Sequence, residues 1–212
     1  MIETFSPDTN PFIVGVVADT HIPDRVDGLH PYLIDALRGQ KVQLLFHAGD
    51  ISVLSVLNTL AEVAPVLAVT GNRDFLLRKQ IPLTRHLVIF GSQIALTHGH
   101  LGMRTYWRDK VAYLLHGYKF ERYQDRLNRS FKQARVIIFG HTHHAENRWI
   151  DDRLYFNPGS VSKGDYLQPG PTFGLLKFFE NGRIEASLIP LTGAVIRMKK
   201  WEIISHQILN QM

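Results

Sequence analysis

Polar fragments follow five apolar runs of the chain, each at the point where the run ends. The clearest run covers residues 12–18, is apolar and β-branched almost throughout, and stops at Asp19. Such a run is typical of a strand buried on both faces. Open α/β sheets gather their sites at the carboxyl ends of such strands, so we expect the fragments to converge. The fragments are Asp19-Thr20-His21, Gly49-Asp50, Gly71-Asn72-Arg73-Asp74, His98-Gly99-His100 and Gly140-His141-Thr142-His143.

The spacing of apolar residues predicts alternating strands and helices first, and mainly strands after His144. Helices are expected over residues 31–37 and 52–64, with Ser52 as a possible N-cap and Pro65 as the terminator of the second. Strands are expected over residues 12–18, 43–47, 66–69, 86–90, 93–97, 136–139, 147–150, 154–157, 172–179 and 183–190.

Composition narrows the chemistry open to such a site. The chain of 212 residues has no cysteine, which excludes disulfides, thiolate metal ligands and a cysteine nucleophile. An apolar fraction of 45% suffices for one core, so a single domain over residues 1–212 is expected. The formal charge of +5 favours anionic partners without choosing among them. Without a leader-like start or about eighteen unbroken apolar residues, a cytoplasmic protein with no membrane partner is expected.

Each fragment alone has an ordinary structural explanation. Asp19 and Asp50 could cap a turn or a helix, and Asn72 could occupy a left-handed turn. His21 could be a surface histidine, but the two later histidine pairs share one spacing and are hard to explain as core residues. Carboxylate, imidazole and amide ligands together suit Mn, Fe, Zn, Co or Ni, with Mg less natural beside several histidines.

As an ordered set, D-x-H, GD, GN-x-D, HGH, GHTH and the later Asn157-Pro158-Gly159-Ser160 resemble the calcineurin-like metallophosphoesterases, from about residue 12 to residue 190. Within that family the chain is similar to the small bacterial and archaeal phosphodiesterases, which also resemble the retromer subunit of vacuolar sorting. The resemblance implies a four-layer α/β/β/α sandwich that hydrolyses a phosphate ester, with a phosphodiester preferred over a phosphomonoester. The last fragment is either a simple turn or part of the floor of the site.

The resemblance also implies a ligand set for two divalent cations, with manganese preferred. One metal would be held by Asp19, His21, Asp50 and His143, and the other by Asp50, Asn72, His98 and His141. Asp50 would therefore be shared. Two cations about 3.5–4 Å apart can share a hydroxide that attacks phosphorus in line, so no protein nucleophile is needed. The substrate would be a small phosphate ester or a nucleotide.

Three residues are candidates for catalysis beyond holding metal: His100, Arg73 and Asn72. His100 could orient the phosphate or donate a proton, although it could equally be a satisfied turn histidine. Arg73 could clamp a phosphate oxygen, with Asp74 holding Arg73 or its loop. Arginine departs from the family, which often carries cysteine or histidine at that position. Because arginine stays charged, the general acid is left open. His47 is expected to be a packed, hydrogen-bonded residue rather than a ligand.

Residues 101–135 form a basic segment between the two histidine fragments. It contains nine Lys or Arg and three acids, a net charge of +6 that leaves about −1 for the remainder. Two helices are expected, over residues 106–115 and 120–133, with a break near Gly117. We interpret the segment as a helical insertion beside the metal site.

Three roles for this insertion stay open. A basic wall could recruit a nucleotide or nucleic acid, with aromatic residues for stacking. A solvated helix face, and a lid or homodimer contact, are both preferred to that role. The basic wall would comprise Arg104, Arg108, Lys119, Arg122, Arg126 and Arg129, with Tyr106, Trp107 and Tyr123. The apolar contact would comprise Trp107, Tyr113, Leu114, Leu115, Tyr118 and Phe120.

Two other functions compete with a small-molecule phosphodiesterase. The first is a metal-poor interaction scaffold, since the retromer subunit keeps this fold while departing from the full ligand set. The second is a nuclease that uses the basic segment, which would bind nucleic acid with strong salt dependence. The complete ligand set argues against the scaffold. The role of the chain from Ala194 onward stays open.

Overall fold

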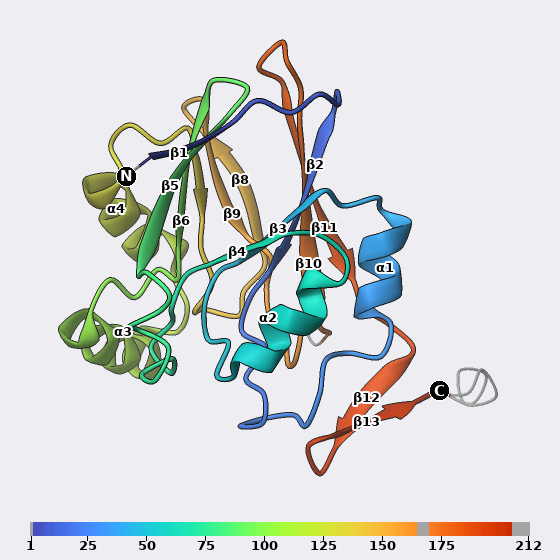
Figure 1. Ribbon diagram of the computed structural model, residues 1–212. Helices are drawn as coiled ribbons and strands as arrows, with labels where there is room; N and C mark the ends of the chain where they lie inside the picture. The colour runs from blue at the N-terminus through green and yellow to red at the C-terminus, as the bar shows by residue number, and fades with distance from the viewer. Residues whose placement is uncertain (1, 165–169, 205–212) are drawn as a thin grey trace.

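The computed structural model describes residues 2–164 and 170–204 (Figure 1). Strands dominate, as the apolar runs predicted. Its helices are α1 (Leu33–Gly39), α2 (Leu54–Ala61), α3 (Met103–His116) and α4 (Phe120–Ser130). Its strands are β1 (Ile2–Phe5), β2 (Phe12–Val17), β3 (Leu44–His47), β4 (Val66–Ala68), β5 (Thr84–Ile89), β6 (Ser92–Thr97), β7 (Val136–Ile138), β8 (Glu146–Ile150), β9 (Arg153–Asn157), β10 (Thr172–Phe178), β11 (Ile184–Pro190), β12 (Ala194–Arg197) and β13 (Lys200–Ile203).

Two large sheets carry the fold. One has the strand order β11-β10-β2-β3-β4, with β2, β3 and β4 parallel. The other has the order β1-β5-β6-β7-β9-β8, with β6, β7 and β9 parallel. The parallel strands in each sheet are the apolar runs that precede the polar fragments. Their carboxyl ends therefore meet at one edge of each sheet.

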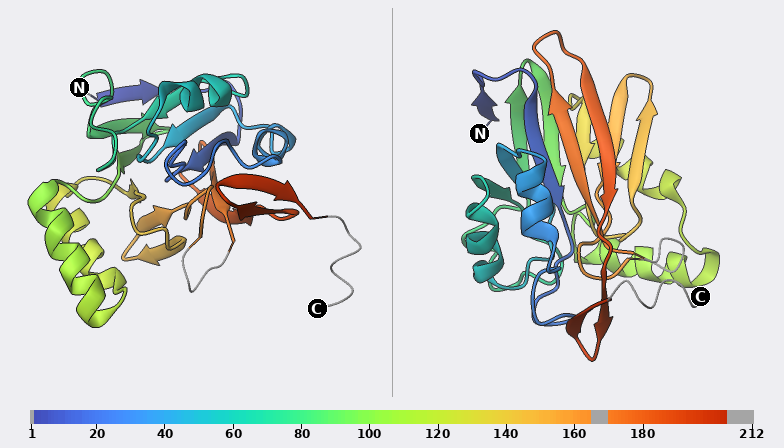
Figure 2. Two further views of the ribbon diagram at one scale, coloured as in Figure 1. Left: turned by 90° about the horizontal axis from the view of Figure 1, so that it is seen from below. Right: turned by 90° about the vertical axis from the view of Figure 1, so that its right-hand side faces the viewer.

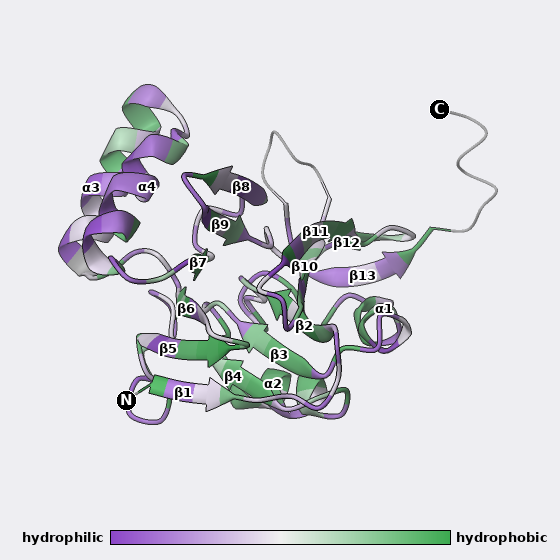
Figure 3. Cartoon of the chain, turned by 90° about the horizontal axis from the view of Figure 1, so that it is seen from above, coloured by the Kyte–Doolittle hydropathy of each residue, from purple (hydrophilic) through white to green (hydrophobic). Residues whose placement is uncertain are grey.

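Alternation along the strands explains the four layers. In β3, Leu44 and Phe46 enter the core between the two sheets, whereas Leu45 enters a second core that the first sheet shares with α1 and α2. In β7, Ile138 faces the core between the sheets and Ile137 enters a third core beneath α4. The resulting order of helices, sheet, sheet and helices confirms the predicted α/β/β/α sandwich (Figures 2 and 3).

Helices α3 and α4 form a helical arm beside the second sheet, seen at the upper left of Figure 3. Gly117 ends α3 with a φ of +66°, where the sequence predicted the break. Helix α4 buries Phe120 and Leu127 against the sheet. Helix α3 is joined to α4 by an ion pair between Asp109 and Arg126 at 2.6 Å. Among the described residues, no helix has the length and apolarity that a membrane crossing demands.

Several predicted details were wrong. Ser52 is not the N-cap of α2, because Val53 holds that position and the Ser52 backbone N–H donates to Asp74. Helix α4 ends at Ser130, three residues earlier than predicted. Strand β1 and the β12–β13 hairpin were not predicted. The hairpin is held by Trp201, whose indole N–H donates to the carbonyl of Gly28 at 2.8 Å. The end of the chain from residue 205 lies outside the described residues.

Candidate metal centre

The carboxyl edges of both sheets supply the candidate ligands. Asp19, Asp50 and Asn72 follow β2, β3 and β4 of the first sheet. His98 follows β6 of the second sheet, and His141 and His143 follow β7. The structure thus brings all seven predicted ligands, His21 included, to the gap between the two sheet edges. All are buried except His141 and His143, which are half-buried.

The backbone leaves regular strand geometry at most of these positions. Positive φ angles occur at five of the seven residues: Asp19 (+54°), His21 (+51°), Asp50 (+54°), His141 (+74°) and His143 (+60°). Each such angle costs roughly 1–3 kcal/mol for a residue other than glycine. The loops are fixed to each other, because the N–H groups of Asp19 and His21 donate to the carbonyls of Gly49 and Asp50. The fold therefore holds strained residues in place at this site.

Two glycines allow the loops to approach one another. A Cβ added to Gly71 would lie 2.1 Å from Oδ1 of Asp50, and one added to Gly49 would lie 2.6 Å from Nδ1 of His98. No larger residue fits at either position without displacing a candidate ligand. The glycines of the GD and GN fragments thus have a packing role at the site.

One group of ligand atoms surrounds Asp19. Its Oδ1 lies 3.4 Å from Nε2 of His143 and 3.7 Å from Nε2 of His21. The two imidazole nitrogens are 3.1 Å apart. Three potential ligand atoms from three separate fragments therefore face one small volume.

A second group surrounds the side-chain oxygen of Asn72. This oxygen lies 3.1 Å from Nε2 of His98 and 3.0 Å from Nδ1 of His141. Oδ1 of Asp50 completes the group at 3.4 Å from Nε2 of His98. The members are the four that were predicted for the second metal.

Asp50 lies between the two groups. Its Oδ1 is the atom near His98, while its Oδ2 lies 3.7 Å from Nε2 of His21 in the first group. The backbone N–H of Arg73 also donates to Oδ1 at 2.9 Å, which fixes the carboxylate. Its two oxygens therefore face different sets of histidines, as a shared ligand requires. Asp19 also approaches both groups, since its Oδ1 lies 4.0 Å from Nε2 of His98.

Hydrogen bonds outside the centre suit these imidazoles to metal binding. Nδ1 of His98 lies 2.7 Å from the carbonyl of Ala48, and Nδ1 of His143 lies 3.0 Å from the carbonyl of Lys163. A carbonyl can only accept, so each Nδ1 carries the proton and donates it. Nε2 is then left with a lone pair that points into the centre. Within the described residues, Oδ1 of Asp19 is buried without a hydrogen-bond donor. Such an acceptor-rich site fits a divalent cation.

The pKa shifts of the candidate ligands also support a cation at this site. Burial, and then the positive charge of nearby groups, lowers the pKa of His21 to about 2, so this imidazole is neutral. Burial also holds the pKa of His141 well below its ordinary value. Burial, together with repulsion from Asp19, raises the pKa of Asp50 to about 6. Burial lowers the pKa of His98, but attraction to Asp50 and Asp19 outweighs burial and raises this pKa above its ordinary value. The two buried carboxylates therefore favour positive charge beside them, and a divalent cation would supply it.

Comparison with known proteins agrees with this geometry. The model of the calcineurin-like phosphoesterase superfamily domain matches residues 12–181. The chain belongs to this superfamily. A probable metallophosphoesterase from Methanothermobacter thermautotrophicus is 34% identical over 148 residues, which cover 70% of this chain and 76% of that protein. A phosphodiesterase from Methanocaldococcus jannaschii is 26% identical over 166 residues, covering 77% of this chain and 91% of that protein.

Solved structures share the fold at lower identity. Vacuolar Protein Sorting 29 from Cryptosporidium parvum has a TM-score of 0.65 and 17% identity, and the match covers 87% of this chain and 100% of that one. Vps29 from Entamoeba histolytica complexed with Zn²⁺ has a TM-score of 0.62 and 21% identity, covering 84% of this chain and 98% of that one. These structures support the phosphoesterase fold and say nothing further of this chain.

The last residue of β9 and the loop after it, residues 157–162, form hydrogen bonds with the backbone beneath the candidate ligands. The hydroxyl groups of Ser160 and Ser162 each donate to the carbonyl of Asp19 at 2.9 Å. The amide of Asn157 donates to the carbonyl of Gly140 at 3.0 Å. The fragment Asn157-Pro158-Gly159-Ser160 therefore forms part of the floor, and is more than a turn.

Arg73 lies at the mouth of the centre and is held by a residue that the sequence did not reveal. Its guanidinium donates to the carboxylate of Asp24, and both side chains are partly exposed. Asp74 does not hold Arg73. It is buried and accepts the backbone N–H groups of Ser52 and Gly71, each at 2.7 Å, so it fixes the loop instead. Asp24 stands in an ordinary turn sequence, and no signal in the chain singled it out.

His100 and His47 are both buried near the ligands. The ring of His100 lies 5.4 Å from that of His98, and burial lowers the pKa of His100 to about 3. His100 is thus a neutral, buried imidazole next to the candidate ligands. It does not line the cavity that opens over the centre. His47 lies 3.3 Å from the hydroxyl of Thr20 and accepts the N–H of Gly49, as expected for a packed histidine.

A cavity of about 930 Å³ opens over the centre. Its floor includes His141 and His143, and Arg25 and Arg73 stand on one side. The arm supplies much of the remaining wall. Of the residues assigned to a basic wall, Arg126 is excluded from contact with a polyanion, because it is buried and paired with Asp109.

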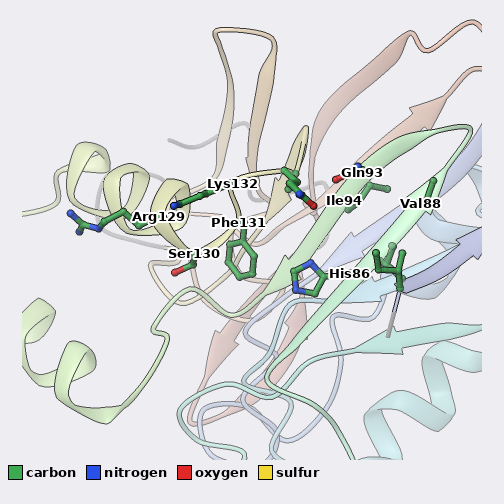
Figure 4. Close-up of a pocket in the computed structure, with 12 residues that line it drawn as sticks. His86, Val88, Gln93, Ile94, Arg129, Ser130, Phe131 and Lys132 are labelled. Carbon is green, nitrogen blue, oxygen red and sulfur yellow. The ribbon is translucent and has the colours of Figure 1, made fainter.

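A second cavity, of about 320 Å³, lies on the outer face of the second sheet (Figure 4). His86 and Val88 of β5 line it together with Phe131 and Lys132 beyond α4. Gln93, at the amino end of β6, also lines it, whereas the metal centre follows the carboxyl end of that strand. This cavity therefore belongs to the opposite end of the sheet.

Proposed function

We propose that the chain is a metal-dependent phosphodiesterase with a dinuclear centre. The observation that carries the proposal is the position of Asp50, whose two oxygens face two separate groups of ligand atoms. Membership of the calcineurin-like phosphoesterases supports hydrolysis of a phosphate ester. The relative named as a phosphodiesterase supports a diester substrate.

Two divalent cations, when bound, would supply Lewis-acid activation of water and neutralise charge on the phosphoryl group. Asp19, His21 and His143 would hold one cation, and Asn72, His98 and His141 the other, with Asp50 shared. Several imidazoles beside carboxylates favour manganese over magnesium, with iron, zinc, cobalt and nickel as further candidates. No side chain is required as the nucleophile.

Arg73 would position the substrate. Its guanidinium is charged at any working pH and lies in the cavity wall, where two N–H groups can donate to one phosphate. Asp24 orients this group from behind. His100 supports His98 and His141 in this proposal rather than touching substrate, because it lies buried behind them. Protonation of the leaving group then falls to water.

Three broader predictions accompany this function. Residues 1–212 are proposed to form a single domain in which residues 101–135 are an insertion. The protein is proposed to act in the cytoplasm on a small phosphate ester. A homodimer through the arm stays a prediction, supported by the exposure of Leu114 (77%) and Leu115 (70%) on α3.

Metal analysis and turnover of bis-p-nitrophenyl phosphate with Mn²⁺ test the proposal. We expect about two metals per chain, and we expect His98→Ala to lower both metal content and turnover. His116→Ala is a matched control, because His116 is exposed at the end of α3 and should change neither. A protein without bound metal and without turnover would instead be an interaction scaffold. Salt-dependent binding of nucleic acid with cleavage would indicate a nuclease.

A further inference from the structure

Four tyrosines from the arm line the cavity over the metal centre: Tyr106, Tyr113, Tyr118 and Tyr123. Tyr106 and Tyr113 lie seven residues apart in α3 and therefore share one face of that helix. Asp109 and Lys110 lie between them on the same face and also line the cavity. One face of α3 thus forms a wall of the site.

This wall begins at the metal centre. The ring of Tyr106 lies 5.8 Å from that of His141, a candidate ligand, and the ring of Tyr123 lies 6.4 Å from it. A substituent of a phosphate bound at the centre would therefore lie next to the rings of Tyr106 and Tyr123.

The four rings have different surroundings. Tyr118 stacks on His144 at 3.8 Å and donates its hydroxyl to Glu146, and Tyr123 is buried beneath Arg126. These two rings are fixed by the protein and form the rear of the wall. Tyr106 is half-buried and Tyr113 is 40% exposed, so their rings offer surface to a ligand.

The cavity is also basic. Arg25, Lys110 and Lys163 line it in addition to Arg73. Among the described lining residues, the one carboxylate is Asp109, and it is paired with Arg126 at 2.6 Å. Positive charge therefore surrounds an aromatic wall, with the metal ligands at the floor.

From this arrangement we infer that α3 forms a nucleobase subsite, so that the substrate is a nucleotide-type phosphodiester. The inference rests on the proposed function. The phosphate lies at the metal centre, and the base stacks against Tyr106 and Tyr113. The arginine and lysine side chains of the cavity bind further anionic groups. A cavity of about 930 Å³ lies in the size range of small-molecule sites, which suits a mononucleotide or dinucleotide. Trp107, which the sequence suggested for stacking, does not line the cavity and is 57% exposed.

Calorimetric titration of the Mn²⁺-loaded full chain tests the subsite without relying on turnover. The two probes are adenosine 5′-monophosphate and ribose 5-phosphate, which share the phosphate and ribose and differ in the base. We expect the nucleotide to bind about tenfold or more tightly than the sugar phosphate. Tyr106→Leu and Tyr113→Leu should each reduce this ratio, while Tyr106→Phe and Tyr113→Phe should retain it because the ring remains.

Leu115→Ala is the matched control, because Leu115 is an exposed residue of α3 that does not line the cavity, and it should leave the ratio unchanged. Equal affinities for the two probes, or no binding of either, would overturn the inference. So would a ratio that both leucine variants leave intact. Hydrolysis of bis-p-nitrophenyl phosphate is measured in parallel, so a phosphodiesterase without base preference is distinguished from a protein with no phosphodiesterase activity.

Discussion

The candidate metal centre and the helical arm are built in different ways. At the centre, the candidate ligands follow strands of the core, and loops from the two sheets are joined by hydrogen bonds. The backbone N–H of His141 donates to Asp19, and Nδ1 of His98 donates to the carbonyl of Ala48. The arm lines the cavity with one face of α3, which is joined to α4 by the pair between Asp109 and Arg126. Contacts with the core thus fix the geometry of the centre. The arm, in our proposal, determines which substrates the centre accepts. Changes at the centre should abolish chemistry, and changes in the arm should alter preference.

The largest effect is expected from Asp50→Asn. This change removes the charge that faces both ligand groups and leaves an amide, which is a poorer bridging ligand. Turnover of bis-p-nitrophenyl phosphate should fall by about a thousandfold, with less metal bound per chain. Unchanged turnover in this variant would mean that Asp50 is not shared between metals.

The next largest effect is expected from Gly71→Ala. The added Cβ would lie 2.1 Å from Oδ1 and 2.4 Å from the backbone nitrogen of Asp50, so the loop must move. A ligand misplaced in this way should lower turnover by about a hundredfold, with a loss of about 1–3 kcal/mol in the free energy of unfolding. Gly39→Ala is the control, because nothing lies within 4 Å of its added Cβ. Equal behaviour of the two variants would refute the packing role.

A smaller effect is expected from Arg73→Ala. Loss of a guanidinium that clamps phosphate should lower kcat by roughly ten- to a hundredfold, while metal content stays constant because no ligand side chain is removed. Asp24→Asn should give a weaker form of the same defect, since it only frees the guanidinium. If Arg73→Ala bound less metal, Arg73 would be supporting the centre rather than the substrate.

The smallest effect on turnover is expected in the arm, from Asp109→Asn. The substitution leaves the buried Arg126 without its partner, at a local cost of about 3 kcal/mol. Backbone amides of α3 should exchange hydrogen faster, while amides of the two sheets keep their protection from exchange. Turnover of bis-p-nitrophenyl phosphate should change less than in the variants above. Asp125→Asn, at an exposed position of α4, is the control. Faster exchange throughout the sheets would show that the arm stabilises the whole fold.

The same contrast explains what the sequence could predict. Candidate ligands such as Asp19 and His98 directly follow apolar runs in the sequence, so their convergence was predictable. Strand β1 is a strand because it pairs with β5, and the role of Asp24 depends on its approach to Arg73 across 49 residues. Such long-range contacts leave no local pattern.

In the arm, the helices were predictable and their roles were not. Arg126 reads as one more surface cation, yet it is buried against Asp109. Tyr113 was expected in a lid or dimer contact, and the fold places it in the cavity wall. Which face of α3 meets the site depends on how α3 packs against α4, where Asp109 pairs with Arg126, and the third core in turn places α4 on the sheet.

Anomalous diffraction from crystals grown with Mn²⁺ tests the central claim most directly. Two anomalous peaks are predicted, one beside Asp19, His21 and His143 and the other beside Asn72, His98 and His141. Asp50 should lie between them with one oxygen toward each. A single peak, or no peak at this edge of the sheets, would contradict the account.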